Sequence, residues 1–126
     1  MSCCTCIQCS CPNDLFLLLL LEPQYLGCYE DKETPRQLEK MMYYRVNGED
    51  NTPERCASTC KARGYLGYFG LQDGFECFCG NTLAHQQRKA ESDCNSKCPG
   101  DKSINCGGPW RNSIYMFPNY KGKVSK

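Results

Sequence analysis

Apolar and polar positions near the middle of the chain predict one β-hairpin. Residues 65–72 and 75–79 are rich in aromatic and other apolar side chains, and Asp73-Gly74 lies between them. An Asp-Gly pair in this setting is typical of a tight hairpin loop. Such a loop would place Gly70 opposite Cys77, where its missing side chain would leave room for a helix to approach.

A short helix is predicted just before this hairpin. Thr52 offers a side-chain oxygen for an N-cap, Pro53 is favoured at the first helical position, and Gly64 suits the C-terminal end. Cys56 and Cys60 are four positions apart, so they lie on one face of this helix. The helix therefore presents two thiols to a neighbouring element.

The hairpin offers two matching cysteines. Cys77 and Cys79 are two apart on the second strand and point to one side of the sheet. We therefore expect two disulfides between the helix and the hairpin. The residues alone leave two pairings open, Cys56–Cys77 with Cys60–Cys79 or Cys56–Cys79 with Cys60–Cys77, because the cysteines of each element share a face.

The rest of the pattern divides the chain into three parts. We expect an N-terminal segment at 1–24, one folded domain at 25–117 and a basic tail or linker at 118–126. Further strands are predicted at 25–29 and 113–117, whereas 30–51 is ambiguous between helix and loop.

Cysteine content indicates the class of protein. The chain of 126 residues has 13 cysteines and one histidine. Eight of the cysteines lie between Cys28 and Cys106, an even set in a chain long enough for one small domain. This pattern is typical of a disulfide framework, which persists in oxidising compartments. The sequence therefore predicts a small disulfide-rich α+β domain, secreted or on the extracellular face of the cell surface.

The N-terminal segment differs in composition from the rest. Five cysteines fall within positions 3–11, and an apolar, leucine-rich run occupies positions 15–21. The run is too short to span a bilayer. We interpret residues 1–24 as a degenerate signal segment, since their removal leaves the even set of cysteines. A cysteine-rich metal-binding tract and a lipidation site are the alternatives.

Charge and motif content argue against several functions. The net charge is +1, so neither nucleic acid nor an anionic membrane is expected as a partner. A zinc site in the domain would need Cys-x-x-Cys pairs or several histidines, and His85 stands alone, so no metal or cofactor is expected. Glu30-Asp31 and Glu49-Asp50 are interpreted as solvated acids rather than glycosidase carboxylates. With no phosphate loop or nucleophile elbow, the chain is not expected to be an enzyme.

Residues 25–117 resemble a WSC domain, because all eight cysteines and their neighbours agree with that family's pattern together. The five additional N-terminal cysteines depart from the pattern, as does Phe69, where the family suggests a small residue. The motifs that carry the resemblance are Tyr25-Leu26-Gly27-Cys28-Tyr29-Glu30-Asp31, Thr52-Pro53-Glu54-Arg55-Cys56 with Cys60, Gly70-Leu71-Gln72, Glu76-Cys77-Phe78-Cys79-Gly80-Asn81, Cys94-Asn95-Ser96-Lys97-Cys98, Gly100-Asp101, Cys106-Gly107-Gly108 and Tyr115.

The resemblance implies a fold, a disulfide pattern and an activity. The fold would be a PAN/apple-like module, one helix stapled to an antiparallel sheet, of the type found in cell-wall stress sensors, Kremen ectodomains and polycystins. The activity would be weak binding of a polysaccharide or cell-surface glycan. The alternative is a protein-recognition or structural module of a receptor, with an extracellular protein as partner. The implied disulfides are Cys28–Cys94, Cys56–Cys77, Cys60–Cys79 and Cys98–Cys106.

Candidate sugar contacts are nominated on chemistry, because the resemblance fixes no contact residue. Pyranose C–H faces pack on exposed aromatic rings while the hydroxyls form hydrogen bonds with polar neighbours. An exposed aromatic strip with nearby amides would favour glycan binding, whereas a broad apolar patch with a polar rim would favour protein recognition. The aromatic candidates are Trp110, Tyr43, Tyr44 and Tyr68, and the polar candidates are Asp73, Asn81 and Asn112.

Overall fold

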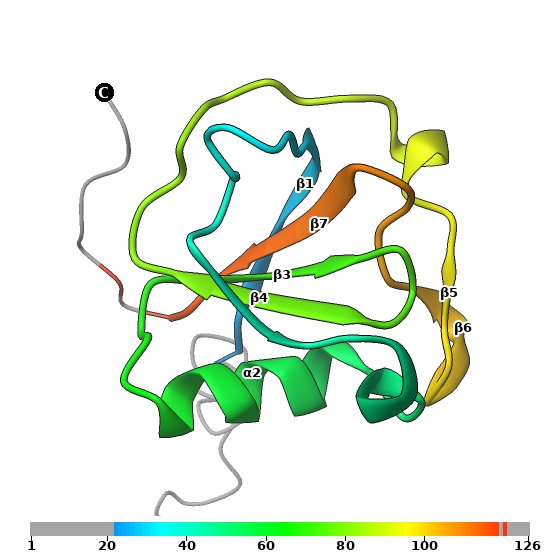
Figure 1. Cartoon of the computed structure of the whole chain (residues 1–126). Helices are drawn as coiled ribbons and strands as arrows, with labels where there is room; N and C mark the ends of the chain where they lie inside the picture. The colour runs from blue at the N-terminus through cyan, green and yellow to red at the C-terminus, as the bar shows by residue number, and fades with distance from the viewer. Residues whose placement is uncertain (1–21, 119, 121–126) are drawn as a thin grey trace, which may run out of the picture.

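A five-stranded antiparallel sheet carries one α-helix on one face in the computed structural model, which describes residues 22–118 and 120 (Figure 1). The strand order is β1-β7-β3-β4-β2, and β5 and β6 form a separate two-stranded ladder. The predicted small disulfide-rich α+β fold is confirmed. The elements are β1 (Gln24–Glu30), β2 (Lys40–Tyr43), the 3₁₀ helix η1 (Arg45–Gly48), α2 (Pro53–Ala62), β3 (Tyr68–Gln72), β4 (Glu76–Gly80), the 3₁₀ helix η2 (Glu91–Asp93), β5 (Lys97–Cys98), β6 (Asp101–Asn105) and β7 (Arg111–Met116).

Helix α2 begins and ends at the residues that the sequence predicts. The Thr52 hydroxyl oxygen accepts a hydrogen bond from the backbone N–H of Arg55 at 3.0 Å, and Pro53 is the first helical residue. Gly64 follows the helix with φ of 88°, and the N–H of Tyr65 donates to the carbonyl of Cys60 at 3.0 Å. This is the Schellman ending, in which a left-handed glycine lets the chain turn back onto the last helical carbonyls.

The hairpin of β3 and β4 is present, but its register differs by one residue from the prediction. Gln72 pairs with Glu76, so the loop has three residues, Asp73, Gly74 and Phe75, rather than two. Gly70 therefore lies opposite Phe78 and not opposite Cys77. The predicted register was wrong because the Asp-Gly signal locates the loop without fixing how many residues follow it before pairing resumes.

Gly70 makes room for Asn112, and not for the helix as predicted. It lies on the face of the sheet that points away from α2, and a Cβ atom there would come within 1.7 Å of Oδ1 of Asn112. The glycine thus makes room for a buried amide on the next strand. The approach of α2 instead involves the opposite face, where Leu71 pairs with Cys77 and Phe69 with Cys79.

Buried side chains form one cluster on each face of the sheet. On the α2 side the cluster is dominated by sulfur and aromatic rings, and on the other side by aliphatic and aromatic carbon. The first contains Tyr43, Cys56, Cys60, Phe69, Leu71, Cys77, Cys79, Cys98, Cys106 and Phe117, and the second Tyr29, Leu38, Tyr68, Phe78, Leu83 and Ile114.

Four disulfides link the described residues, and two of them, Cys56–Cys77 and Cys60–Cys79, join α2 to β4. Their pairing is the one that the family resemblance implies, and it selects one of the two helix–hairpin schemes that the residues alone left open. The bridges are Cys28–Cys94, Cys56–Cys77, Cys60–Cys79 and Cys98–Cys106.

The ambiguous stretch 30–51 contains β2 and η1. Strand β2 is a short edge strand that pairs with β4, with Met41 opposite Phe78. Asn51 then closes the stretch: its side-chain amide donates to the carbonyl of Gly74 at 2.8 Å and its oxygen accepts from the Tyr43 hydroxyl at 2.5 Å. This buried amide ties the segment before α2 to the hairpin loop.

Candidate functional site

A groove of about 290 Å³ lies on the side of the sheet that faces away from α2, and we call it the Trp110 groove. Side chains alternate between faces along a strand, so Glu76 and Phe78 point away from the helix that Cys77 and Cys79 face. The groove contains an aromatic ring, an amide, two carboxyl groups and a guanidinium. It is lined by Arg36, Met41, Gln72, Asp73, Glu76, Pro109 and Trp110.

Trp110 is exposed yet held in one position. Its side chain is 49% exposed, and its backbone adopts a φ of 55°, which is unusual for a bulky residue. The turn that carries it is closed by paired backbone hydrogen bonds between Gly108 and Arg111, both at 3.0 Å. The carbonyl of Trp110 also accepts from the N–H of Asp31 at 2.9 Å. An exposed ring on a constrained turn is a frequent feature of binding sites.

The guanidinium of Arg36 fixes one side of the groove. Its carbon lies 5.3 Å from the ring centroid of Trp110 and 4.8 Å from that of Phe78, within cation–π range of both. Its Nε and Nη2 atoms donate to one carboxylate oxygen of Asp31 at 3.0 and 2.7 Å. Since the Asp31 carboxylate balances its charge, Arg36 acts here mainly as a support for the indole ring.

The two other carboxyl groups give the groove a mildly acidic character. Asp73 is exposed at the loop of the hairpin, and Glu76 is half-buried beside it. Burial raises the pKa of Glu76, and the negative charge of Asp73 raises it further. Gln72 adds an amide, whose oxygen accepts from Nδ2 of Asn112 at 2.5 Å. These groups are suited to hydrogen bonding with hydroxyls.

The structure brings only two of the nominated sugar contacts together, Trp110 and Asp73. Tyr44 is 48% exposed but lies outside the groove, with the guanidinium of Arg45 5.8 Å from its ring centroid. Asn81 is also exposed and outside the groove, and its side-chain oxygen accepts from the N–H of Gly67 at 3.0 Å. These two positions do not extend the site.

Burial removes the two remaining tyrosine candidates. Tyr43 is 7% exposed and belongs to the core cluster beneath α2; its hydroxyl donates to Asn51 and its ring lies 3.9 Å from the guanidinium carbon of Arg55. This burial raises the pKa of Tyr43 to about 12. Tyr68 is 1% exposed and packs edge-on against Tyr120, with ring centroids 5.5 Å apart. Neither ring can stack on a sugar.

Asn112 is likewise wrong as a surface contact. It is fully buried in the centre of the sheet, where it occupies the space that Gly70 leaves and bonds to Gln72. Its role is to orient the amide of Gln72 from beneath the groove. The sequence did not reveal the other lining residues, because strand register, a turn and the ambiguous segment bring them together. They are Arg36, Met41, Gln72, Glu76 and Pro109.

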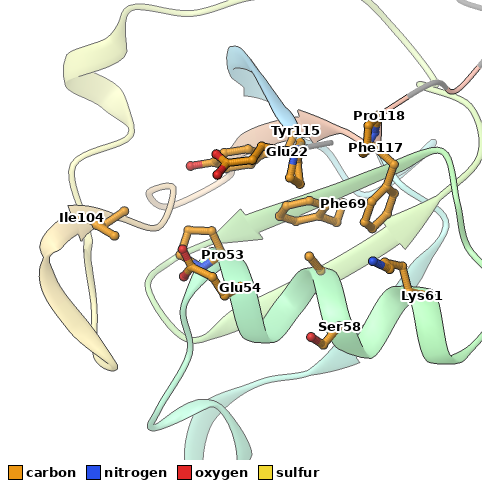
Figure 2. A pocket seen from close by; sticks show the side chains of 12 residues that line it. Glu22, Pro53, Glu54, Ser58, Lys61, Phe69, Ile104, Tyr115, Phe117 and Pro118 are labelled. Carbon is orange, nitrogen blue, oxygen red and sulfur yellow. The ribbon is translucent and has the colours of Figure 1, made fainter. Parts of the chain in front are cut away.

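A second cavity, of about 370 Å³, lies between α2 and the sheet, and we call it the helix-side cavity (Figure 2). The ring of Tyr115 stacks on that of Phe69, with centroids 4.9 Å apart and planes 2° from parallel. The rim carries polar and charged groups. The cavity is lined by Glu22, Pro23, Pro53, Glu54, Ala57, Ser58, Lys61, Phe69, Ile104, Tyr115, Phe117 and Pro118.

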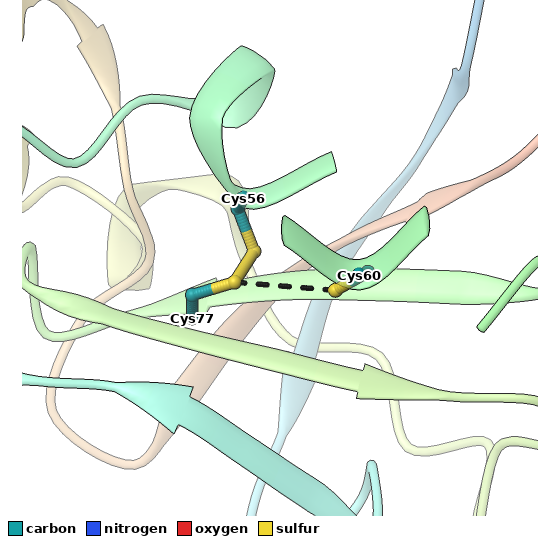
Figure 3. A group of neighbouring side chains, drawn as sticks. All are labelled: Cys56, Cys60 and Cys77. Carbon is teal, nitrogen blue, oxygen red and sulfur yellow. Dashed lines mark hydrogen bonds between the residues drawn. A yellow bond between two sulfur atoms is a disulfide. The ribbon is translucent and has the colours of Figure 1, made fainter. Parts of the chain in front are cut away.

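Three cysteine sulfurs in the same core lie within 4.8 Å of one another (Figure 3). Cys56 and Cys77 form one disulfide and Cys60 belongs to another, and the sulfurs of Cys60 and Cys77 are 4.0 Å apart. Thiolates, not disulfide sulfurs, bind metals in proteins. The group is therefore the place where two bridges pass each other between α2 and β4.

Among the described residues, no helix is both long and apolar enough to cross a membrane. The apolar run at 15–21, like the five N-terminal cysteines, lies outside the described residues.

Comparison with known proteins gives consistent matches to one module. A family model described as "WSC domain" matches residues 25–108. A WSC domain-containing protein of Arthroderma benhamiae is 40% identical over 71% of this chain and 12% of its own length. Kremen protein 1 of Xenopus laevis is 34% identical over 79% of this chain and 21% of its own. Xylosyltransferase sqv-6 of Caenorhabditis briggsae is 36% identical over 87% of this chain and 13% of its own. The chain thus spans between about a tenth and a fifth of these relatives.

The relatives correct one expectation from the sequence. We expected that the chain is not an enzyme, and that expectation is contradicted because several relatives are named as xylosyltransferases. The matches cover only a region of the size of this module, at 34% to 38% identity in those three relatives. The absence of catalytic motifs in a module of this type does not decide whether its parent protein is an enzyme.

Proposed function

Because the chain belongs to the WSC domain family, we propose that it is an extracellular carbohydrate-binding module whose binding surface is the Trp110 groove. The four disulfides and the relationship to Kremen protein 1 support an extracellular receptor-type module. The ligand we propose is a polysaccharide or cell-surface glycan.

The exposed and supported ring of Trp110 is the observation that carries this proposal. A pyranose can lay its C–H face on the free side of the indole, since Arg36 and Asp31 already hold the ring in place. The sugar hydroxyls would then reach Asp73 and Glu76, which line the same groove. A ring that needs no reordering on binding loses little conformational entropy.

We expect weak binding by a single module. The groove is shallow and buries little of a ligand, so the Kd for an extended polysaccharide should be roughly 10 μM to 1 mM. Several modules in one parent protein, or repeated sites along one polysaccharide, would raise the effective affinity without any new contact.

A glycan array tests the proposal with two matched variants. The chain should bind at least one class among glucan, xylan, chitin and animal glycans. Trp110→Ala should reduce binding about tenfold or more, because it removes the stacking surface. Tyr44→Ala removes an equally exposed ring outside the groove and should change binding less than twofold. Equal losses in both variants, or no glycan bound at millimolar protein, would overturn the proposal.

The N-terminal composition supports a further part of this proposal, that residues 1–24 act as a signal segment, leaving a domain at 25–117 with a tail at 118–126. Mass spectrometry of the protein secreted from cells that express the full chain would locate its new N-terminus. Recovery of the intact chain inside cells would contradict secretion.

Protein recognition is the second candidate function, and the helix-side cavity favours it. That cavity is an apolar hollow with a polar rim, the kind of surface that typically binds a protein partner.

A further inference from the structure

We propose that the helix-side cavity is a second binding site, which takes an extended protein segment with one large apolar side chain flanked by lysine or arginine. The site is independent of the Trp110 groove, because the two lie on opposite faces of the sheet and share no lining residue. One module could therefore bind a glycan and a protein at the same time.

A row of aromatic rings forms the floor of the cavity. The centroid of Phe69 is 5.1 Å from that of Phe117 and 4.9 Å from that of Tyr115, and Figure 2 shows these three side chains. The floor is rigid, since Phe69 is on a central strand and its neighbouring helix is tied to the sheet by two disulfides. A rigid aromatic surface is well suited to hold an apolar anchor residue.

The dimensions of the cavity fit a side chain and a short length of backbone. Its volume is about 370 Å³, and a neighbouring hollow of about 290 Å³ shares Ile104 and Tyr115 with it. The second hollow adds the polar side chains of Glu91, Ser103 and Asn105. Together they form a path from the apolar floor towards groups that can bond to a peptide backbone.

The charges on the rim indicate the sign of the partner. Glu22 and Glu54 line the cavity and Glu91 lines the adjoining hollow, against one cation, Lys61, among the described lining residues. Burial raises the pKa of Tyr115, which lines both hollows, and the negative charges of Glu54 and Glu91 raise it further. Both carboxylates therefore make the potential negative where the two hollows meet. A basic segment would complement this rim and be steered towards it.

The chemistry of the lining favours a peptide over a glycan at this site. A sugar needs hydrogen-bond partners around most of its edge, whereas Pro53, Ala57, Phe69 and Phe117 present carbon. Apolar anchors with a charged rim are the usual arrangement of a protein interface.

Selection from a random peptide display library on the full chain tests the proposal. Enriched peptides should combine an aromatic or large aliphatic residue with nearby lysine or arginine. Ala57→Trp fills the cavity and should weaken the selected peptides at least tenfold, while Ala62→Trp adds the same ring to an exposed position of α2 outside the lining and should leave binding unchanged. Glu54→Lys reverses an exposed rim charge and should weaken binding threefold or more. Trp110→Ala should have no effect.

Each other outcome overturns the proposal. No enrichment, enrichment of acidic peptides, or peptides that bind equally well to Ala57→Trp and Glu54→Lys would show that the cavity does not take a basic apolar segment. Glycan binding that is lost in Ala57→Trp but kept in Trp110→Ala would assign the cavity to a sugar. Self-association that Ala57→Trp abolishes would assign it to a second copy. Disulfide mapping of each variant checks its fold, and Glu54→Lys carries the test if Ala57→Trp misfolds.

Discussion

Trp110 shows how single residues prepare the proposed glycan site. Its exposure follows from a left-handed backbone conformation at the turn before β7, and its orientation from the guanidinium of Arg36. Asp31, whose carboxylate binds the guanidinium of Arg36, is itself buried. Its second oxygen accepts a hydrogen bond from the N–H of Gln37 at 2.7 Å. The ring is therefore supported by a chain of contacts that begins in the core.

Glu76 gives a pH-dependent prediction at the residue scale. Because burial and Asp73 raise its pKa, the folded state favours the protonated acid. Its contribution to stability is present below the ordinary glutamate pKa of about 4.3 and is lost as the pH rises through the raised value. Glu76→Gln should therefore increase the free energy of unfolding at pH 7 and should have no effect at pH 3.

Denaturant unfolding at the two pH values measures this effect, and Asp101 provides a control of opposite sign. Hydrogen bonds from the hydroxyl and N–H of Ser103 lower the pKa of Asp101, so its carboxylate stabilises the fold above its ordinary pKa. Asp101→Asn should therefore reduce stability at pH 7. A loss of stability in Glu76→Gln at pH 7 would contradict the assigned environment of Glu76.

Sequence chemistry identified part of the candidate site at the residue scale. Trp110 and Asp73 could be nominated because an indole and a carboxylate next to turn-forming residues are recognisable without a structure. The burial of Tyr43 and Asn112 could not be predicted, because it depends on which face of the sheet each side chain takes and on what covers that face. An error of one residue in the register assigns each side chain of a strand to the wrong face of the sheet.

At the element scale, the helix was predictable because its ends are determined locally. Thr52, Pro53 and Gly64 act within a few residues of one another, through capping bonds that the sequence alone implies. The register of the hairpin depends on how many residues the loop contains. The sequence located the loop at Asp73-Gly74 but did not determine its length. Strand β2 was missed because a four-residue edge strand has too few positions to establish an alternating pattern.

Gly64 gives a prediction for α2. Its φ of 88° is the left-handed conformation that ends the helix, and no atom lies within 4 Å of the position that a Cβ would take. Gly64→Ala should therefore destabilise the protein by backbone strain alone, by about 1 kcal/mol, and lower the Tm by about 5 °C. Gly64→Asn should cost less, because asparagine tolerates this conformation. Equal Tm values for glycine and alanine would contradict the Schellman ending.

At the scale of the whole molecule, two disulfides join α2 to β4 and two others close loops of very different length. Cys28–Cys94 closes 66 residues of chain, whereas Cys98–Cys106 closes 8. The chain-entropy model assigns about 4 kcal/mol to the long loop and about 2.5 kcal/mol to the short one. For a domain whose total stability is in the range of about 5–15 kcal/mol, the longer bridge is a large share.

Paired substitutions test this ranking. Replacing Cys28 and Cys94 by serine should reduce the free energy of unfolding more than replacing Cys98 and Cys106, by about 2 kcal/mol, as measured by denaturant unfolding under oxidising conditions. A larger loss from the short bridge would show that local packing, and not loop closure, determines what each disulfide contributes.

The central claim, that a glycan stacks on Trp110, can be tested by tryptophan fluorescence because the chain has one tryptophan. Titration of the full chain with soluble glucan, xylan and chitin oligosaccharides should shift the emission of this ring to shorter wavelength and saturate with a Kd of roughly 10 μM to 1 mM. Calorimetry on the same samples should give the same Kd. Oligosaccharide binding that calorimetry detects while the emission of Trp110 stays unchanged would contradict the claim.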